Sequence, residues 1–262
     1  MFIIYVISNK LNHFIELDSD KNGDIYLVIH SGSRYLGKQI AEHYQKTAIK
    51  KLSLDVNRDK LIADLKSQGR EAEIQQALKS LEPLKIRKEL AYLEGDSFND
   101  YICDMKIVQE YANYNRKAIA YDIIKTMNLI IDDDFTTIHN YIETESMILR
   151  KGAISAKKGE KVIIPINMRD GSIIAIGKGN EDWNYSAPHG SGRVFSRSKC
   201  KSVITMEEFH ESMEGIYSTS VKESTIDESP MAYKPIEEIL ENTKDTIDII
   251  DIIKPLYNFK AS

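Results

Sequence analysis

Four of the six histidines lie in segments that suit chemistry. His30 ends a β-rich run directly before a Ser-Gly-Ser turn, and His189 lies between a proline and a glycine. His13 and His139 follow or precede an asparagine in short segments rich in apolar and hydroxyl residues. Imidazole can act as a nucleophile, as an acid or base, or as a metal ligand. No two of these histidines are three or four residues apart, so the spacing leaves open whether the rings converge or each packs structurally. His43 and His210 lie in helical patterns and are predicted to be structural.

Residues 184–197, with the sequence NYSAPHGSGRVFSR, form the most informative segment. Gly190 and Gly192 allow the backbone to approach a ligand closely. Arg193 and Arg197 are four residues apart and would lie on one side of a helix. Helix amides, Arg side chains and hydroxyls together make a phosphate site, beside which His189 could act as a nucleophile or as an acid or base. The alternative is a glycine-rich surface turn.

The charge of the chain is unevenly distributed. Residues 150–201 carry eleven Lys or Arg and four acids, a balance of +7, whereas residues 202–251 carry three Lys and thirteen acids, a balance of -10. A basic stretch interleaved with glycine and aromatic residues suits a nucleotide or another polyanion. A solvated basic face is the alternative.

The composition is that of a folded globular protein, with 262 residues, 42% hydrophobic residues and a net charge of -5. Two cysteines, Cys103 and Cys200, cannot form a disulfide framework, which favours a reducing compartment, and we expect the cytoplasm. No apolar run approaches the roughly 20 residues of a membrane-spanning helix, and the opening apolar run is predicted to be a strand.

The elements that must position these side chains follow from periodicity. In the first half, residues 24–30 read as a buried strand that ends in a glycine turn, and a helix is expected over about 37–50. Long helical patterns at 58–82 and 97–128 predict a helical hairpin.

The second half changes character. Residues 162–166 and 172–176 predict a β-hairpin with Asp170-Gly171 at its turn, followed by a glycine-rich loop and an acidic helical tail punctuated by prolines. The chain is therefore predicted to be one α+β domain over 1–262, with central β-sheets and a helical hairpin inserted at about 55–128.

Several ordered motifs match a known family. They are Asn12-His13-Phe14-Ile15-Glu16, His30-Ser31-Gly32-Ser33-Arg34, Tyr111-Ala112-x-x-Asn115-Arg116, His139-Asn140, Arg150-Lys151-Gly152-Ala153, the segment from His189 to Arg197, Asp227-Glu228-Ser229-Pro230-Met231-Ala232-Tyr233-Lys234 and Lys254-Pro255 with Lys260. The chain resembles the RtcB-type RNA ligases, GTP-dependent enzymes that join RNA 3′-phosphate or 2′,3′-cyclic phosphate ends to 5′-hydroxyl ends in tRNA splicing and RNA repair.

The resemblance implies a mechanism and its catalytic residue. His189 matches the residue that attacks the α-phosphate of GTP, expelling pyrophosphate and leaving guanylyl-histidine. GMP then passes to the RNA 3′-phosphate to give an RNA-ppG end, which the 5′-hydroxyl attacks as GMP leaves. The implied partners are RNA, GTP and an archease-like activator, with no membrane.

The resemblance also implies binding residues. His13, His30 and His139 match ligands of two Mn²⁺ ions. Residues near the nucleotide are matched by Asn12, Glu16, Asn167, Ser172, Ser191, Tyr233 and Lys260, and phosphate or RNA contacts by Arg34, Arg193 and Arg197. Asn167 stands where many members carry Ser, and Ser191 replaces the common Ala between the two glycines.

One departure concerns the amino end. The family carries upstream an Asp-x-Gly-Cys-Gly-Met type of motif, whose Asp and Cys complete the metal sites, and this sequence has none. The chain therefore reads as an amino-terminally truncated member whose three histidines should hold two cations poorly. Three functions follow from this: an RNA ligase, a catalytically impaired member that only binds guanine nucleotide or RNA, and a dinuclear-metal phosphoesterase.

Overall fold

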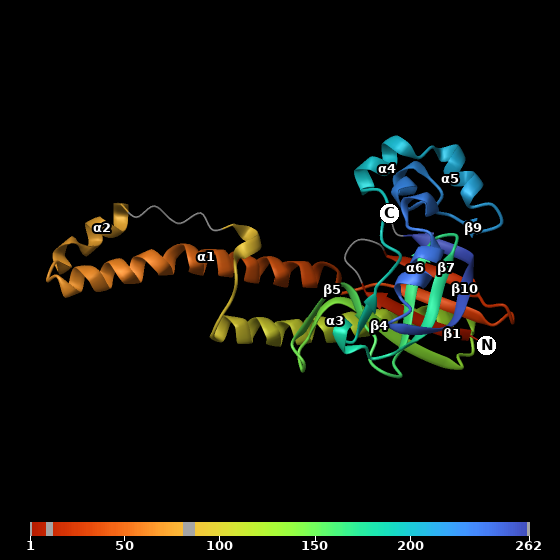
Figure 1. Ribbon diagram of the computed structural model, residues 1–262, viewed down its shortest axis with the longest axis horizontal. Coiled ribbons are helices and arrows are strands. Elements are labelled where there is room, and N and C mark those ends of the chain that lie inside the picture. Colours follow the sequence, from red (N-terminus) through yellow and green to blue (C-terminus); the bar gives the residue numbers. More distant parts are fainter. Residues whose placement is uncertain (1, 9–12, 81–86, 261–262) are drawn as a thin grey trace. The chain divides into compact units, whose positions relative to one another are not determined.

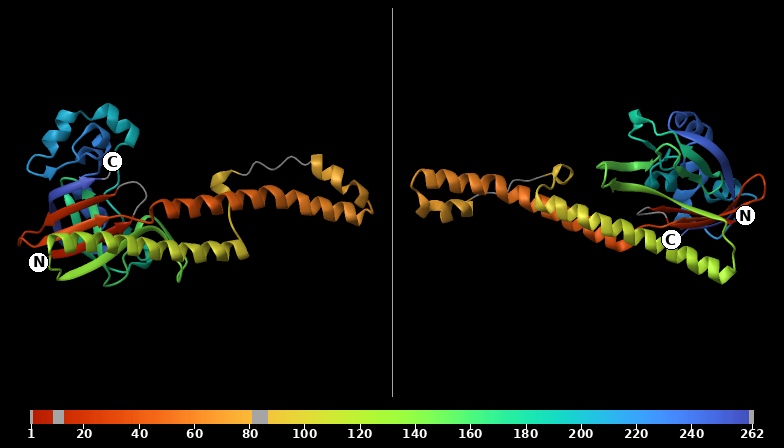
Figure 2. Two further views of the ribbon diagram at one scale, coloured as in Figure 1. Left: turned by 180° about the vertical axis from the view of Figure 1, so that it is seen from behind. Right: turned by 90° about the horizontal axis from the view of Figure 1, so that it is seen from below.

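The computed structural model describes residues 2–8, 13–80 and 87–260, and the chain divides into two units (Figure 1, Figure 2). Residues 1–34 and 109–262 form the first, here called the sheet unit, and residues 35–108 form the second, the helical unit. Helices and strands alternate irregularly along the chain, which confirms the predicted α+β class. The helical unit overlaps the segment in which the sequence predicts an insertion.

Ten strands of the described chain form one sheet, in the order β6-β7-β10-β2-β3-β1-β4-β5-β8, with β9 beside β10. Their bounds are β1 (Phe2–Ser8), β2 (Phe14–Ser19), β3 (Ile25–His30), β4 (Asp133–Glu143), β5 (Ile148–Ser155), β6 (Lys161–Asn167), β7 (Gly171–Gly177), β8 (Ser186–Pro188), β9 (Tyr217–Ser218) and β10 (Ile247–Lys260).

The middle of this sheet decides where the histidines lie. Strand β1 pairs in parallel with β3 on one side and with β4 on the other. Its register places Ile7 opposite His30, and Ser8 opposite Ile138, the residue before His139. Two histidines that are more than a hundred residues apart in sequence are therefore brought to neighbouring positions, one strand apart.

The helices are α1 (Arg34–Ser67), α2 (Ile74–Ser80), α3 (Asp96–Met127), α4 (Arg197–Val203), α5 (Met206–Ser212) and α6 (Ile236–Asn242). The expectation of separate helices at 37–50 and 58–82 is wrong, because α1 runs unbroken to Ser67. No glycine or proline lies between Gly37 and Ser67 to stop it, and it ends just before Gly69, whose φ is 68°. Helix α3 matches the pattern at 97–128.

The helical unit is held together by contacts between α1 and α3. The hydroxyl of Tyr44 donates to a carboxylate oxygen of Asp104 at 2.8 Å, and the Tyr44 ring packs on that of Tyr101 with 5.1 Å between centroids. In the sheet unit, the second half of α3 packs Ile119 and Ile123 against the face of β3.

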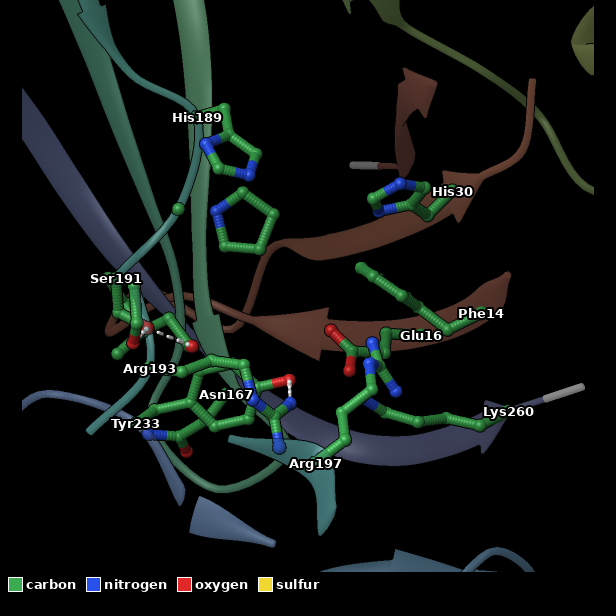
Figure 3. Close-up of a pocket in the computed structure, with 14 residues that line it drawn as sticks. Phe14, Glu16, His30, Asn167, His189, Ser191, Arg193, Arg197, Tyr233 and Lys260 are labelled. Atoms are coloured by element: carbon green, nitrogen blue, oxygen red, sulfur yellow. Dashed lines mark hydrogen bonds between the residues drawn. The ribbon is translucent and has the colours of Figure 1, made fainter. Parts of the chain in front are cut away.

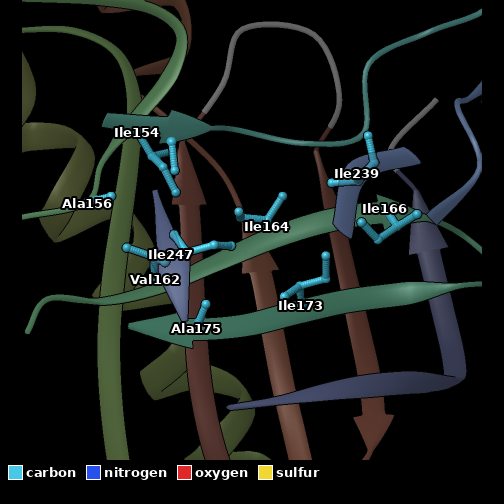
Figure 4. Close-up of a cluster of buried hydrophobic side chains, with 10 residues drawn as sticks. Ile154, Ala156, Val162, Ile164, Ile166, Ile173, Ala175, Ile239 and Ile247 are labelled. Carbon is cyan, nitrogen blue, oxygen red and sulfur yellow. The ribbon is translucent and has the colours of Figure 1, made fainter. Parts of the chain in front are cut away.

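The main core lies around the β6-β7 hairpin (Figure 4). Ile164 and Ile173 are fully buried there, as expected for a run of β-branched residues covered on both faces. The hairpin and its turn at Asp170-Gly171 confirm the sequence prediction. Gly171 has φ +80°, and a Cβ there would overlap the carbonyl of Ile253 in β10, so only glycine fits.

The end of the described chain departs from the predicted helical tail. After α5 and α6, residues Ile247–Lys260 form β10, which pairs with β7 along its first half and with β2 along its second. Pro255 is tolerated because it lies where the register shifts, between Pro255 and Tyr257. The strand thereby carries Lys260 to the same edge of the sheet as the start of β2.

Cys103 is exposed on α3 in the helical unit, whereas Cys200 is buried in α4 of the sheet unit. Within the described ranges, none of the helices combines the length and the apolar character needed to cross a membrane.

Candidate active site

A cavity of about 360 Å³ lies at the end of β2, β3 and β10 in the sheet unit (Figure 3). It collects side chains from segments far apart in the sequence, and most of the residues predicted for the site line it. They are Phe14, Glu16, His30, Asn167, His189, Ser191, Arg193, Arg197, Tyr233 and Lys260, together with backbone of Pro165, Ile166, Gly190 and Gly192.

His189 directly follows β8 and is held in one orientation. Its Nδ1 lies 2.7 Å from the carbonyl oxygen of Gly152. Because a carbonyl only accepts hydrogen bonds, Nδ1 must carry the proton, and the lone pair is then on Nε2. Burial lowers the pKa of His189, although the bond to Gly152 opposes this, so the neutral ring is favoured. This is the state that a nucleophilic imidazole requires.

The other rings gather behind His189. The His139 ring stacks on that of His189 with 4.6 Å between centroids, and the His30 ring meets His139 edge-on at 5.5 Å. Both nitrogens of His30 and of His139 are buried and have no hydrogen-bond partner among the described residues. Burial lowers the pKa of His139 to about 3 and that of His30 well below its usual range, in both cases helped by neighbouring histidines. These imidazoles are therefore neutral, and each has a nitrogen lone pair to which no described group binds.

A divalent metal ion fits the chemistry of these donors. Buried polar atoms without partners are costly, and a borderline cation is the usual partner of neutral imidazole. Among the described residues, however, no three His, Cys, Asp or Glu side chains are placed to hold one ion together. His30 and His139 supply a pair of ligands, and His13 lies near enough to His30 to lower its pKa.

A smaller cavity of about 280 Å³ lies beside the first and shares Phe14 and His30 with it. His13 and Arg34 line it. Burial lowers the pKa of His13, and the positive charge of Arg34 lowers it further. Arg34 has φ 53°, a left-handed conformation that non-glycine residues rarely adopt and that marks a functional constraint. Its loop is fixed by Asn115 of α3, which also lines this cavity.

Asn115 holds the loop by two hydrogen bonds. Its Nδ2 donates to the Ser31 hydroxyl at 2.9 Å and to the Gly32 carbonyl at 3.1 Å. A single side chain thus ties the end of β3 to α3. It also fixes the loop after which α1 begins, at Arg34.

Two carboxyl groups lie on the buried face of β2. Burial raises the pKa of Glu16 to about 7, against the effect of Lys260. Asp18, fully buried and with both oxygens unpartnered, has a strongly raised pKa because of burial and of Glu16. Glu16 lines the cavity and Asp18 lies behind it, so the carboxylate nearest to a ligand is that of Glu16.

A set of ionic hydrogen bonds, here called the Glu228 network, closes the opposite wall. Glu228 accepts from Lys260 at 3.1 Å, from Arg197 at 2.8 Å and from the Tyr233 hydroxyl at 2.5 Å. Burial would raise the pKa of Glu228, but the charge of Lys260 and the other donors hold it below its usual value. Arg193 joins through Tyr233, its guanidinium 4.9 Å from the ring centroid.

The amino-acid sequence of this chain is similar to that of a known protein family. The family described as tRNA-splicing ligase RtcB matches residues 11–261. The chain belongs to the RtcB family. It is 30% identical to the RNA-splicing ligase RtcB of Escherichia coli K12 over 268 residues, covering 95% of this chain and 59% of that protein. It is 26% identical to the tRNA-splicing ligases RtcB of Aeropyrum pernix and Nanoarchaeum equitans, over 48% and 49% of their lengths. The chain thus spans about half to three fifths of the relatives it matches.

The structure brings most of the residues predicted from the RtcB resemblance together, but several of them already have partners. Asn167 uses its amide within the β6-β7 turn, donating to Asp170 at 2.8 Å, and the Ser191 hydroxyl donates to the Ile166 carbonyl at 2.7 Å. Ser172 is fully buried in β7, its hydroxyl has no partner, and it does not line the cavity. Asn12 lies outside the described residues.

Arg193 and Arg197 do converge, although not as predicted. Helix α4 begins at Arg197, so Arg193 precedes it and the two do not share a helical face. They meet because both contact Glu228. Arg193 also donates to the carbonyls of Phe195 and Asp227, which makes it mainly a brace for the loop, whereas Arg197 is 44% exposed at the mouth of the cavity.

Sequence reasoning assigned no role to Glu228, Phe14 or Asn115, although each belongs to a motif that the RtcB resemblance rests on. Glu228 was detectable as an acid in an otherwise apolar and proline-containing run, Ser229-Pro230-Met231-Ala232. A charged residue in such a setting is buried only with partners, which is what the Glu228 network shows. His43 and His210 are exposed and lie outside the cavity, in agreement with their structural assignment.

Proposed function

We propose that this chain carries the catalytic centre of a GTP-dependent RNA ligase that joins 3′-phosphate or 2′,3′-cyclic phosphate ends to 5′-hydroxyl ends. The supporting observation is His189, whose Nδ1 is fixed on the Gly152 carbonyl so that Nε2 keeps its lone pair at the cavity. In the proposed first step, Nε2 attacks the α-phosphorus of GTP, the bond to the bridging oxygen breaks, and pyrophosphate leaves. Guanylyl-histidine is the product.

The later steps follow the same chemistry. An oxygen of the RNA 3′-phosphate attacks the guanylyl phosphorus, the phosphorus–nitrogen bond breaks, and His189 is regenerated beside an RNA-ppG end. The 5′-hydroxyl then attacks the RNA phosphate and GMP leaves. A 2′,3′-cyclic end must first be opened by water to give the 3′-phosphate.

Glu16 and Lys260 support guanine as the base. A guanine presents two adjacent N–H donors and one carbonyl acceptor on its edge, and a carboxylate beside an ammonium group complements that pattern. Both side chains line the cavity and interact electrostatically, since Lys260 lowers the pKa of Glu16. Phe14, below the Lys260 ammonium at 5.4 Å, adds an apolar surface for the ring.

Mn²⁺ is the proposed metal, in two sites that would share His13, His30 and His139 as protein ligands from this chain. When bound, it would neutralise charge on the phosphates that react. Arg197 at the mouth of the cavity, and Arg34 in the adjoining one, would orient phosphates of the nucleotide and the RNA. An archease-like activator stays a prediction from the resemblance, and a cytoplasmic location stays a prediction from the two cysteines.

One observation favours a second function. No three described side chains close around a single ion, so a member that binds guanine nucleotide or RNA without turnover is the alternative. A phosphoesterase gains no separate support from the structure.

Incubation with α-labelled GTP and Mn²⁺ tests the proposal. We expect an acid-labile, alkali-stable label on the wild-type protein and none on His189→Ala, while His210→Ala, at an exposed histidine, labels like the wild type. A folded wild-type protein that acquires no label would contradict the ligase proposal. Retained binding of GTP in that case would support the binding function.

A further inference from the structure

A third cavity of the sheet unit, of about 370 Å³, has no role in the steps above. It lies along β5 and β8 and is bounded by the turn that carries Trp183, the only tryptophan of the chain. Trp183 is 58% exposed and Leu149 is 70% exposed, so two large apolar side chains border it without being covered. Exposed apolar and aromatic side chains at the edge of a cavity are typical of binding surfaces.

The turn is rigid although the Trp183 side chain is exposed. The next two residues, Asn184 and Tyr185, have φ of 48° and 53°, and each such non-glycine conformation costs about 1 kcal/mol or more. The Tyr185 amide donates to the Asn180 carbonyl at 2.9 Å, and the Tyr185 carbonyl accepts from the Ala156 amide at 2.7 Å. The backbone of this turn is thus in an unfavourable conformation that several hydrogen bonds hold in place, which suggests a functional constraint.

Arg150 anchors the turn from beneath. Its side chain is buried and donates to the Ser186 hydroxyl at 2.9 Å, to the Tyr141 hydroxyl at 3.1 Å and to the Asn184 carbonyl at 3.3 Å. An arginine on β5 that donates to two further strands, β4 and β8, and to the turn fixes the position of the indole relative to β5 and β8.

This cavity adjoins His189 directly. Pro188, which lines it, precedes His189 in the chain, and Gly152, which also lines it, accepts the hydrogen bond from His189 Nδ1. A group bound here is therefore separated from the reacting imidazole by one residue of β5 and one of β8.

The charges around the cavity orient an occupant. Lys151 is exposed on one side and has no ion-pair partner among the described side chains. On the other side, Glu181 and Asp182 precede Trp183. Phosphates are attracted toward Lys151 and repelled from the indole side, whereas a base can stack on the indole.

We propose that this cavity binds an unpaired base of the RNA, near the 3′ end that is joined, by stacking on Trp183. The proposal rests on the proposed function and adds to it the position of a substrate nucleotide. Single-stranded RNA is commonly bound by stacking of splayed bases on aromatic side chains. The volume suits one nucleotide, since sites for small ligands begin at about 300 Å³.

The single tryptophan makes the test direct. Titration with a short single-stranded RNA bearing a 3′-phosphate should quench the Trp183 fluorescence, because stacked bases quench indole. An oligomer of the same length and charge that lacks bases should leave it unquenched. Trp183→Ala should bind the RNA roughly tenfold more weakly, in the range measured for stacked bases, and Trp183→Phe should recover most of the affinity.

Tyr217→Ala is the matched control, because Tyr217 is 69% exposed and lies elsewhere in the sheet unit, stacked on Tyr257. Its RNA affinity should equal that of the wild type. Equal quenching by the abasic oligomer, or equal RNA affinity of Trp183→Ala, would overturn the base site and leave this face for a protein partner.

Labelling with α-labelled GTP is run on the wild-type protein in parallel. Label without base-dependent quenching removes the base site and leaves the ligase proposal in place. Base-dependent quenching without label supports the base site and contradicts the ligase proposal.

Discussion

The two walls of the candidate active site differ in whether their buried polar groups have hydrogen-bond partners. On one wall, His30 and His139 are buried to below 10% exposure, and none of the residues that the structure describes bonds to any of their four ring nitrogens. On the other, Glu228 is equally buried but accepts from a lysine, an arginine and a tyrosine. The first wall is incomplete without a ligand, whereas the second is complete within the chain.

This difference separates binding from support. Partnerless imidazoles weaken the folded chain and gain stability when a cation binds, so they belong to the reacting side. A satisfied ionic network is stable without a ligand and holds Lys260 and Arg197 in place for the contacts proposed for them. Arg193 and Tyr233, predicted as ligand contacts, therefore act first by fixing the loop that carries His189.

Removing the central acid should break the second wall most severely. Glu228→Gln removes the carboxylate that pairs with buried Lys260 and one of the two carboxylates that Arg197 contacts, and we expect a loss of about 3 kcal/mol in the free energy of unfolding. Urea denaturation measures it. Glu238→Gln is the control, because the Glu238 ion pair with Lys234 is solvent-exposed and should matter by less than about 0.5 kcal/mol. Equal effects of the two substitutions would show that the network is not structural.

The first wall should respond to metal. Mn²⁺ at a hundred times its dissociation constant should stabilise the wild type by about 2.7 kcal/mol. For a chain of this size this raises the melting temperature by roughly 5–10 °C, as read by calorimetry. His30→Ala should abolish the shift, whereas Glu228→Gln should keep most of it despite its lower starting stability. A shift that survives in His30→Ala would place the metal elsewhere.

The Asn115 side chain connects the metal wall to the adjoining cavity. Asn115→Ala removes two hydrogen bonds from the Ser31–Gly32 loop and should cost about 1–2 kcal/mol. It should also weaken RNA binding through the displaced Arg34, an effect that disappears in a background already carrying Arg34→Ala. Asn113→Ala, on the same helix and at a side chain that forms no hydrogen bond with the described residues, controls for the change in helix propensity. Additive effects of the Asn115 and Arg34 substitutions on RNA affinity would contradict the coupling.

The smallest effect is expected at the base of the Trp183 turn, where Glu143 binds Arg150. Burial alone would raise the pKa of Glu143, but hydrogen bonds from Lys157, Ser146 and Arg150 lower it to about 2 from 4.5. A lowered folded-state pKa stabilises the fold above pH 4.5, and this contribution disappears as the pH falls toward about 2. Glu143→Gln should therefore lose about 1 kcal/mol near neutral pH and nothing near pH 2. Urea midpoints across this range test it, and a constant difference would refute the linkage.

Local patterns were enough to predict part of the fold. The β6-β7 hairpin follows from two β-branched runs around Asp170-Gly171, and β3 from one such run before a glycine. These elements are specified by neighbouring residues. The continuous helix α1 was mispredicted because its apolar residues follow the helical period only weakly. The weak pattern suggested a break, although no glycine or proline interrupts the segment.

The site itself depends on long-range pairing. His30 and His139 become neighbours only through β1, which pairs with both of their strands, and no spacing in the sequence encodes that register. The same holds for Lys260, which reaches Glu228 because Ile247–Lys260 is a strand. Its run of β-branched Ile residues is compatible with a strand, but Asp at every third position does not match strand alternation, and Pro255 is tolerated only because it lies at a register shift. The resemblance of the motifs to those of the RtcB family, rather than any periodicity, indicated that these distant residues belong to one site.

The distribution of the two thiols offers an experimental handle. Cys103 is exposed on the helical unit and Cys200 is fully enclosed in the sheet unit, so a maleimide dye should attach at Cys103 alone. The native indole at Trp183 belongs to the sheet unit and can serve as the energy donor. The wild-type protein, without engineered residues, is thus a two-point ruler for the separation of its units and for any change in that separation when RNA is added.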